Sequence, residues 1–312
     1  MEARLQIFSG SSNPRLAGEI VECLGVPAGR ATVGAFDDGE TRIRLEENVR
    51  GSDVFIVQSL CQPTDHHIVE LLLMIDTVRR SSASRVTAVI PYMAYAKQEK
   101  KSQSREPISA KLLANIITRA GADRILAVDL HSAAIEGFFD IPVDHLRAGP
   151  ILANYFDLAD LSNAVVVSPD TGGVARANEL RERLGASLAI VYRQRKGYEN
   201  SHKLEMVGDV QGKTAIIVDD MISTGDTLLL ATEALLERGA AEVYACATHA
   251  VFANNALEAI ERSPLKKVVV TNTIPVDPGS GSSKIEVLSV GSLIAESILR
   301  IHKDISLSSL FT

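Results

Sequence analysis

Short runs of Val, Ile and Ala that alternate with longer helical segments are the feature that most constrains the fold of this chain. The runs contain few polar residues, which is typical of strands buried on both faces. They are Val54–Val57, Val86–Ile90, Ile125–Val128, Val165–Val167, Leu188–Val191, Ala215–Val218, Val243–Ala247 and Val268–Val270. The segments of helical period include His67–Arg80, Ser109–Ala120, Gly173–Leu184 and Thr227–Arg238. This alternation predicts an α/β fold, with mainly parallel sheets covered by helices on both faces.

Length and composition indicate an ordinary globular protein with two domains. The chain has 312 residues, and a single domain typically has roughly 150. Hydrophobic residues make up 46% and charged residues 23%, which excludes a disordered or collagen-like chain. A break near Leu146–Pro150 leaves similar strands and helices on both sides. We therefore predict two similar α/β domains, over residues 1–147 and 148–312.

Charge and cysteine content restrict the partners and the compartment. The chain has 32 Lys and Arg against 39 Asp and Glu, so it has no global positive field to hold nucleic acid. Cys23, Cys61 and Cys246 are far apart, which suggests neither a disulfide framework nor a zinc site. Charges interrupt the N-terminal segment, and no apolar run approaches the ~18 residues of a membrane span. We expect a cytoplasmic protein that binds neither nucleic acid nor membranes.

The segment Thr214–Leu228 carries the most informative motif. A buried strand leads to Asp219 and Asp220, and a turn rich in hydroxyl groups then leads into a helix. Ligands bind at the carboxyl ends of such strands, and the N–H groups of a helix N-terminus can receive phosphate. The turn consists of Ser223, Thr224, Gly225, Asp226 and Thr227. It resembles the phosphoribosyl-diphosphate loop of type I phosphoribosyltransferases; the alternative is a turn that only caps the helix.

Two further predicted strands end near side chains that can bind a metal. His131 follows Ile125–Val128 at a short distance, and Asp170 follows Val165–Val167. Mg²⁺ bound to a nucleotide takes few protein ligands and fills its other positions with phosphate oxygens and water. From the residues alone, a purely structural role for both side chains is weighted equally with a metal-binding role.

The segment Tyr192–Gly212 is long for a connection between two strands and has little apolar periodicity. Loops longer than ~12–15 residues are usually lids or disordered. The segment carries Arg193, Arg195, Lys196, His202 and Lys203. A solvated linker or hairpin and a cationic lid over an anionic substrate remain equally possible from these residues.

Several motifs in a fixed order together resemble the class I ribose-phosphate diphosphokinases, and the resemblance covers essentially the whole chain. Its segments are Leu5–Ser9, Ser11–Pro14, Phe36–Glu40, Ser104–Ile108, Gly137–Pro142 and Ser306–Phe311. The family implies two type I phosphoribosyltransferase-like domains. It also implies transfer of the diphosphoryl group of MgATP to the anomeric hydroxyl of ribose 5-phosphate, which gives 5-phosphoribosyl 1-diphosphate and AMP.

The same resemblance implies roles for individual residues. An ATP site would contain a hairpin from a neighbouring subunit and a second segment; its residues are Phe36, Asp38, Gly39, Glu40, Lys97 and Gln98. His131 and Asp170 would face Mg²⁺. Ribose 5-phosphate would be held by Asp219, Asp220, Arg195 and the turn Ser223–Thr227. Arg193 and Arg195 would act in catalysis from a cationic lid.

The resemblance also implies assembly and regulation. We expect a homo-oligomer, a hexamer built from dimers. Inorganic phosphate and ADP are possible effectors at a subunit interface, near segments that contain Arg50, Ser82, Ser104 and Ser308.

Three functional motifs depart from the usual family pattern. Arg193 replaces a lysine in the lid, Lys97 replaces an arginine in the nucleotide segment, and the sugar-phosphate turn has Ser223 and Asp226 in altered places. An anion such as Asp226 beside a bound phosphate disfavours binding unless the side chain turns away. The favoured reading is an active enzyme. A weakly active or regulatory paralogue is the main alternative, and a phosphoribosyltransferase ranks lower.

Overall fold

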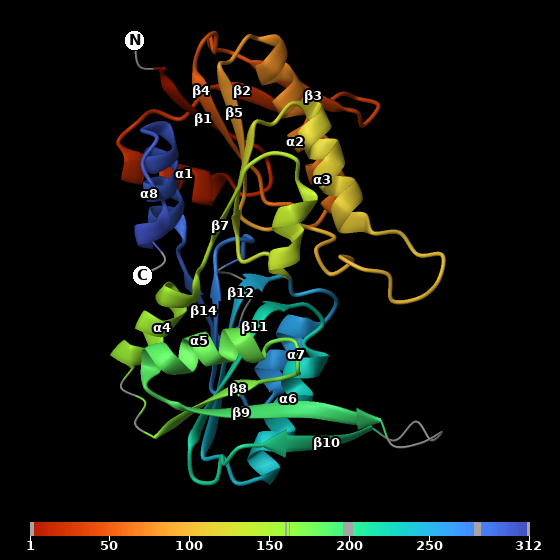
Figure 1. Ribbon diagram of the computed structural model, residues 1–312, viewed down its shortest axis with the longest axis vertical. Helices are drawn as coiled ribbons and strands as arrows, with labels where there is room; N and C mark the ends of the chain where they lie inside the picture. The colour runs from red at the N-terminus through yellow and green to blue at the C-terminus, as the bar shows by residue number, and fades with distance from the viewer. Residues whose placement is uncertain (1–2, 160, 162, 196–201, 278–281, 311–312) are drawn as a thin grey trace. The chain divides into compact units, whose positions relative to one another are not determined.

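The computed structural model describes residues 3–159, 161, 163–195, 202–277 and 282–310 (Figure 1). The chain divides into two units, which are described separately. Unit 1 comprises Met1–Arg147, Thr273–Pro275 and Ser289–Thr312, and unit 2 comprises Ala148–Asn272 and Val276–Leu288. The division after Arg147 coincides with the expected domain boundary. The structure differs at the C-terminal end, because residues 289–310 belong to unit 1, whereas the expected second domain included them.

Unit 1 contains a parallel sheet of five strands in the order β1-β4-β5-β6-β7. The strands are β1 (Leu5–Ser9), β4 (Asp53–Val57), β5 (Arg85–Ile90), β6 (Arg124–Val128) and β7 (Val143–Leu146). Every residue of β4 is buried, as its continuous apolar run predicts.

Helices cover both faces of this sheet. They are α1 (Pro14–Leu24), α2 (Thr64–Arg80), α3 (Ser109–Ala120), the short 3₁₀ helix η1 (Ala133–Phe138) and α8 (Gly291–His302). On one face, α2 and α3 bury Leu71, Ile75 and Ile117 against alternate side chains of the strands. The helices α1 and α8 lie side by side away from α2 and α3 (Figure 1).

The first helix shows how the sequence sets an element. The Asn13 side chain accepts a hydrogen bond from Leu16 N–H, and Pro14 occupies the first turn, where its missing N–H costs nothing. Gly25 ends the helix with φ of 64°, a left-handed conformation that glycine adopts without strain.

A separate antiparallel hairpin also belongs to unit 1. Strand β2 (Ala31–Ala35) pairs with β3 (Thr41–Leu45), and Ile43 and Leu45 pack onto the core beneath α2. The turn that joins them contains Gly39 with φ of 90°.

Unit 2 contains a sheet of seven strands in the order β10-β9-β8-β11-β12-β13-β14. The pair β9–β10 is antiparallel and the other pairs are parallel. The strands are β8 (Ala164–Ser168), β9 (Ser187–Arg195), β10 (His202–Val207), β11 (Thr214–Ile222), β12 (Glu242–Ala250), β13 (Lys267–Thr271) and β14 (Ile285–Leu288).

Two pairs of helices cover the two faces of this sheet. One face packs against α4 (Gly149–Leu158) and α5 (Val174–Leu184) through Phe156 and Leu180. The other packs against α6 (Asp226–Glu237) and α7 (Ala256–Arg262) through Leu235 and Ile260. Together with unit 1, this arrangement confirms the predicted α/β class.

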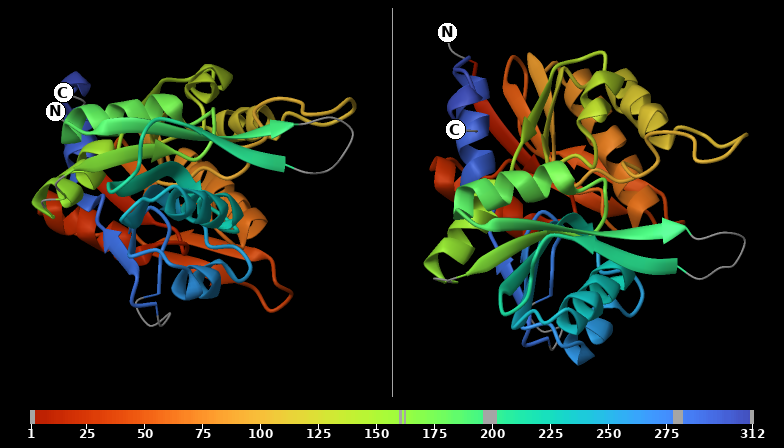
Figure 2. Two further views of the ribbon diagram at one scale, coloured as in Figure 1. Left: turned by 90° about the horizontal axis from the view of Figure 1, so that it is seen from below. Right: turned by 60° about the horizontal axis from the view of Figure 1, so that its bottom comes forward.

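The segment Tyr192–Gly212 is largely a β-hairpin. Strand β9 continues to Arg195, and β10 runs back beside it along the edge of the sheet, as both views of Figure 2 show. The apolar run Leu188–Val191 predicts the first part of β9, whereas the polar residues that follow it carry no clear strand pattern. Residues 196–201, which include Lys196, lie outside the described residues.

None of the helices in the described part of the chain is both long enough and apolar enough to span a membrane.

Candidate functional site

The predicted acidic pair lies within β11. The sequence suggested that the strand ends at Asp219 and Asp220. In the structure it continues to Ile222, so the two residues lie before its end. The neighbouring strand β8 stops at Ser168, which is one residue past the last β8–β11 register pair, Val167 with Ile217. The two carboxylates therefore emerge at the edge where their neighbour has ended, which is the edge at which ligands bind in α/β sheets.

Arg176 contacts both carboxylates. This residue lies in the first turn of α5, and its Nη1 is 3.3 Å from Asp219 Oδ1 and 3.6 Å from Asp220 Oδ1. Burial, and then the adjacent Asp220 carboxylate, raise the pKa of Asp219, and Arg176 only partly offsets them. A half-buried acid with a perturbed pKa at a strand end is a candidate for binding a ligand.

Arg176 is a residue that the sequence analysis missed. Its contact with β11 depends on how α5 packs across the sheet. The available signal was its position three residues after Gly173, at the start of a helix that follows an acidic turn.

The predicted phosphate turn lies between β11 and α6. Gly225 has φ of 84° and precedes the first helical residue, so a left-handed position starts the helix. Thr224 and Thr227 are exposed and Ser223 is half-buried. Exposed hydroxyl and N–H groups at a helix N-terminus can bind an anion by donating hydrogen bonds to it.

Asp226 begins α6, one residue before the predicted start. Its Oδ2 accepts a hydrogen bond of 2.9 Å from the Thr224 hydroxyl. An acid at this position interacts favourably with the positive end of the helix dipole. The side chain is therefore engaged at the helix start while it remains exposed.

The turn after β8 is organised by Asp170. Its Oδ1 accepts hydrogen bonds from Gly172 N–H at 2.8 Å and Gly173 N–H at 2.9 Å. Its backbone carbonyl accepts from the Ser168 hydroxyl at 2.7 Å. These contacts fix an exposed carboxylate at the same edge of the unit 2 sheet as Asp219.

A pocket of about 550 Å³ lies in unit 1 next to the predicted nucleotide segment. Its lining comes from the start of α2 and from the loop after β5, and includes Asp65, His66, Tyr95, Lys97 and Gln98. The Tyr95 hydroxyl donates to Asp65 Oδ1 at 2.6 Å and joins the two segments. The structure therefore brings Lys97 and Gln98 together in one concave surface.

Gln98 is held by the helix that follows it. Its Oε1 accepts from the Ser109 hydroxyl at 2.6 Å, so the amide nitrogen is the group that remains to donate to a ligand. Lys97 is exposed beside it.

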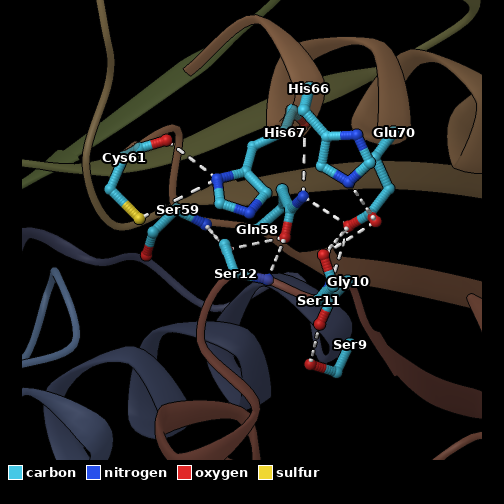
Figure 3. Close-up of polar contacts among 10 residues, drawn as sticks. All are labelled: Ser9, Gly10, Ser11, Ser12, Gln58, Ser59, Cys61, His66, His67 and Glu70. Atoms are coloured by element: carbon cyan, nitrogen blue, oxygen red, sulfur yellow. Dashed lines mark hydrogen bonds and ion pairs between the residues drawn. The ribbon is translucent and has the colours of Figure 1, made fainter. Parts of the chain in front are cut away.

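A largely buried polar network adjoins this pocket through His66 (Figure 3). Glu70 is 1% exposed and accepts hydrogen bonds from Ser11 N–H at 2.7 Å and from Gln58 Nε2 at 2.6 Å. His66, which lines the pocket, has its Nε2 3.6 Å from Glu70 Oε2. The network fixes the loop after β1 to the first turns of α2, which gives the pocket a rigid base.

The predicted hairpin residues lie at the exposed turn between β2 and β3. Phe36 is 51% exposed, and the Arg42 guanidinium lies 5.6 Å from its ring centroid. Glu40 N–H donates to Asp38 Oδ1 at 3.1 Å and stabilises the turn. The residues that line the pocket do not include any of this turn, so Phe36, Asp38, Gly39 and Glu40 are grouped with one another and not with Lys97 and Gln98.

His131 lies in the turn after β6 in unit 1. The turn begins at Asp129, which has φ of 38°. Glu99 lies close by: the Ser132 hydroxyl is the largest cause that lowers its pKa, and His131 contributes further. His131 belongs to unit 1 and Asp170 to unit 2. In the described ranges, no three His, Cys, Asp or Glu side chains are grouped to hold a metal ion.

Arg193 and Arg195 lie near the end of β9. Their backbones pair with Leu204 and His202 of β10. Their side chains lie outside the described residues, so the structure leaves their predicted roles as predictions.

Comparison with known proteins identifies the family. Residues 5–121 match the family profile described as the N-terminal domain of ribose phosphate pyrophosphokinase, and residues 198–312 match the phosphoribosyl synthetase-associated domain. The chain is 51% identical over 309 residues to a ribose-phosphate pyrophosphokinase of Caldanaerobacter subterraneus. The aligned region covers 99% of this chain and 98% of the relative. It is 48% identical to the Bacillus subtilis protein of the same name, over 100% of this chain and 98% of the relative.

A solved structure agrees with these relatives. The phosphoribosylpyrophosphate synthetase of Mycobacterium smegmatis is 41% identical, with a TM-score of 0.91 over 96% of this chain and 99% of that chain. The similarity extends along both units, as the sequence motifs indicated. The chain therefore belongs to the ribose-phosphate pyrophosphokinase family.

Proposed function

We propose that this chain is a ribose-phosphate diphosphokinase. It transfers the diphosphoryl group of MgATP to the anomeric hydroxyl of ribose 5-phosphate and releases AMP. The observation that carries the proposal is the 51% identity to a ribose-phosphate pyrophosphokinase across 99% of the chain. Diphosphoryl transfer depends on positioning and on neutralising the charge of phosphate oxygens, which the polar surfaces of the two units can supply.

Unit 1 provides the proposed ATP site. Within the described residues, the Gln98 amide nitrogen donates no hydrogen bond; it lies beside the exposed Lys97 ammonium, and both residues line the pocket on its rigid polar base. An amide donor and an ammonium suit the base and the phosphates of a nucleotide. We assign the exposed Phe36 and the carboxylates of Asp38 and Glu40 to an ATP site on a neighbouring subunit, because the hairpin turn is separate from the pocket of its own unit.

Unit 2 provides the proposed ribose 5-phosphate site. Asp219 and Asp220 can accept hydrogen bonds from sugar hydroxyls, and the turn Ser223–Thr227 can donate its hydroxyl and N–H groups to the phosphate. Arg176 holds the two carboxylates, so it is a positioning residue for this site. We assign to Arg193 and Arg195 the neutralisation of the transferred phosphates.

The residues proposed for Mg²⁺ partly fit this ion. One oxygen of Asp170 accepts hydrogen bonds from backbone N–H groups, and within the described residues the other oxygen accepts none, so a carboxylate oxygen remains to bind a hard cation. His131 supplies a nitrogen ligand, which Mg²⁺ prefers less than oxygen. When bound, Mg²⁺ would neutralise charge on the ATP phosphates.

Assembly, regulation and location complete the proposal. We propose a homohexamer built from dimers that responds to phosphate or ADP. Light scattering would measure the assembly, and assays with added phosphate would test the response. We place the protein in the cytoplasm, where the free thiols of Cys23, Cys61 and Cys246 would stay reduced.

The test is release of AMP from MgATP by the purified protein, with and without ribose 5-phosphate. We expect AMP formation that requires the sugar phosphate. A folded protein that binds nucleotide but releases no sugar-dependent AMP would instead be a regulatory paralogue.

The Arg193→Lys variant belongs to the same experiment. If Arg193 acts through its charge, the variant should keep the wild-type rate within severalfold, because both side chains are cationic. A large gain in rate would show that the lid arginine limits turnover, which contradicts charge neutralisation as its whole role.

A further inference from the structure

The turn that carries His131 is held by a side chain from the neighbouring strand. Asp129 N–H donates to the Leu146 carbonyl at 3.0 Å and continues the ladder between β6 and β7. The next N–H, that of Leu130, donates instead to Nε2 of His145 at 2.7 Å. An imidazole thus takes the place of a strand carbonyl at the point where the chain leaves the sheet.

The backbone at this point is unusual. Asp129 has φ of 38°, a left-handed conformation that is uncommon for residues other than glycine, although Asp adopts it more readily than most; contacts such as these help to hold it. Arg147 Nη1 lies 3.8 Å from Asp129 Oδ1 and provides a weaker second contact.

The hydrogen bonds of His145 define its tautomer. Nε2 accepts a hydrogen bond from Leu130 N–H, so it carries no proton, and Nδ1 then donates to Glu136 Oε1 at 2.6 Å. The His145 side chain is 4% exposed, and burial is the main cause that lowers its pKa. A neutral imidazole with its proton on Nδ1 satisfies both ring nitrogens and the Leu130 N–H.

His145 and Glu136 together link the chain on both sides of His131. His145 holds the residue that precedes His131, and Glu136 lies in η1, which begins two residues after His131. The Ser132 side chain caps η1 by accepting from Ala134 N–H at 3.3 Å. The chain on either side of His131 is therefore connected through one buried imidazole.

We propose that His145 is a positioning residue, oriented by Glu136, that holds the turn Asp129–His131 so that His131 is presented to the metal–nucleotide complex. This inference rests on the proposed function, because it gives His131 its role there. His145 itself touches neither substrate nor metal.

Three variants test the proposal. His145→Leu removes the acceptor for Leu130 N–H, whereas His145→Gln offers an amide oxygen near the position of Nε2. His302→Leu is the matched control, since His302 binds Asp53 elsewhere in unit 1 through Nδ1 at 2.8 Å.

Two readouts do not depend on activity. The ¹⁵N shifts of the His145 ring should report a protonated Nδ1 and an unprotonated Nε2 in the wild type. Amide hydrogen exchange of the segment 129–132 should be about tenfold faster in His145→Leu, the factor expected for one lost hydrogen bond, and should recover in His145→Gln. His302→Leu should leave this segment unchanged.

In the activity assay, His145→Leu should raise the Mg²⁺ concentration for half-maximal rate and lower kcat, with little change in KM for ribose 5-phosphate. His145→Gln should restore both values. An unchanged metal requirement in a folded His145→Leu protein would overturn the proposal, as would a wild-type ring protonated on Nε2. An inactive wild type with a protected Leu130 amide would refute the proposed function and the role of His145 in it, while the hydrogen bond between Leu130 and His145 would stand.

Discussion

At the residue scale, Asp219 shows how a binding group is held at a cost to the fold. Burial and the neighbouring Asp220 raise its pKa from 3.8 to about 7. Between these two values the folded state keeps a proton that the unfolded state releases, so this residue makes stability fall as the pH rises through that window. Binding sites often hold groups in such unfavourable states.

Asp219→Asn should therefore stabilise the protein above neutral pH. We expect a rise in Tm of a few degrees at pH 8, which corresponds to about 1 kcal/mol, and little change near pH 4. The measurement is thermal unfolding across this pH range. Asp209→Asn is the control, because the Gln211 N–H and then Lys213 lower the pKa of Asp209. Loss of this carboxylate should slightly lower the Tm at pH 8. Equal shifts in Tm for Asp219→Asn at both pH values would contradict this account.

Sequence reasoning identified Asp219 because a carboxylate pair after an apolar run is visible in a single segment. It missed Arg176, because the contact of 3.3 Å depends on the packing of α5 against β11 and has no local pattern. His145 was missed for the same reason, since its two partners, Leu130 in the turn after β6 and Glu136 in η1, lie in other parts of the chain.

At the element scale, the start of α6 explains how an extra acid is tolerated in the phosphate turn. Asp226 is the first helical residue, and it is bonded to the Thr224 hydroxyl. The sequence placed the helix start at Thr227, and a shift of one residue changes the side chain from a loop anion to part of the helix terminus. Helix ends are rarely determined by sequence to better than one or two residues.

Asp226→Asn should tighten binding of ribose 5-phosphate. Removing one negative charge near a phosphate is worth about 1 kcal/mol in a solvated setting, so KM should fall about fivefold. The asparagine oxygen can still accept from Thr224, but loss of the favourable dipole interaction should reduce stability by about 0.3–1 kcal/mol. Steady-state kinetics and thermal unfolding measure the two effects.

Glu237→Gln is the matched control for this change. Glu237 is the last residue of the same helix, so the variant removes one negative charge from α6 at its far end. KM for ribose 5-phosphate should stay at the wild-type value. An equal fall in KM for both variants would assign the effect to net charge and not to the turn.

At the scale of the whole molecule, the most apolar strands were predictable from the sequence, but β1, β2, β3, β7, β10 and β14 lie outside the predicted runs, and the path of the chain was not predictable. The buried strands appear as apolar runs, so all eight predicted runs lie within strands. The hairpin β9–β10 was ambiguous because most residues between Tyr192 and Gly212 are polar. The helix α8 was assigned by its place in the sequence to the C-terminal domain, whereas it packs against α1 in unit 1.

Several side chains anchor α8 to unit 1. It buries Ile294, Ile298 and Ile301. Asp53, which is 2% exposed, accepts a bidentate pair of hydrogen bonds from Arg85 at 2.6 and 2.8 Å and binds His302 Nδ1 at 2.8 Å. Arg85 also donates to the Ile301 carbonyl at 2.8 Å. These contacts, and not sequence distance, determine where the helix belongs.

The fragment 148–312 should therefore expose an apolar helix that the fragment 148–288 lacks. Each buried Ile side chain contributes about 1.5–3 kcal/mol when it is removed from water, so α8 without α1 should promote aggregation. We expect the longer fragment to bind more of a hydrophobic dye, measured by fluorescence, and to form larger species in light scattering. Ile298→Lys in the longer fragment should reduce both signals. Equal dye binding by both fragments would mean that α8 buries its apolar face within unit 2, contrary to the contacts with α1.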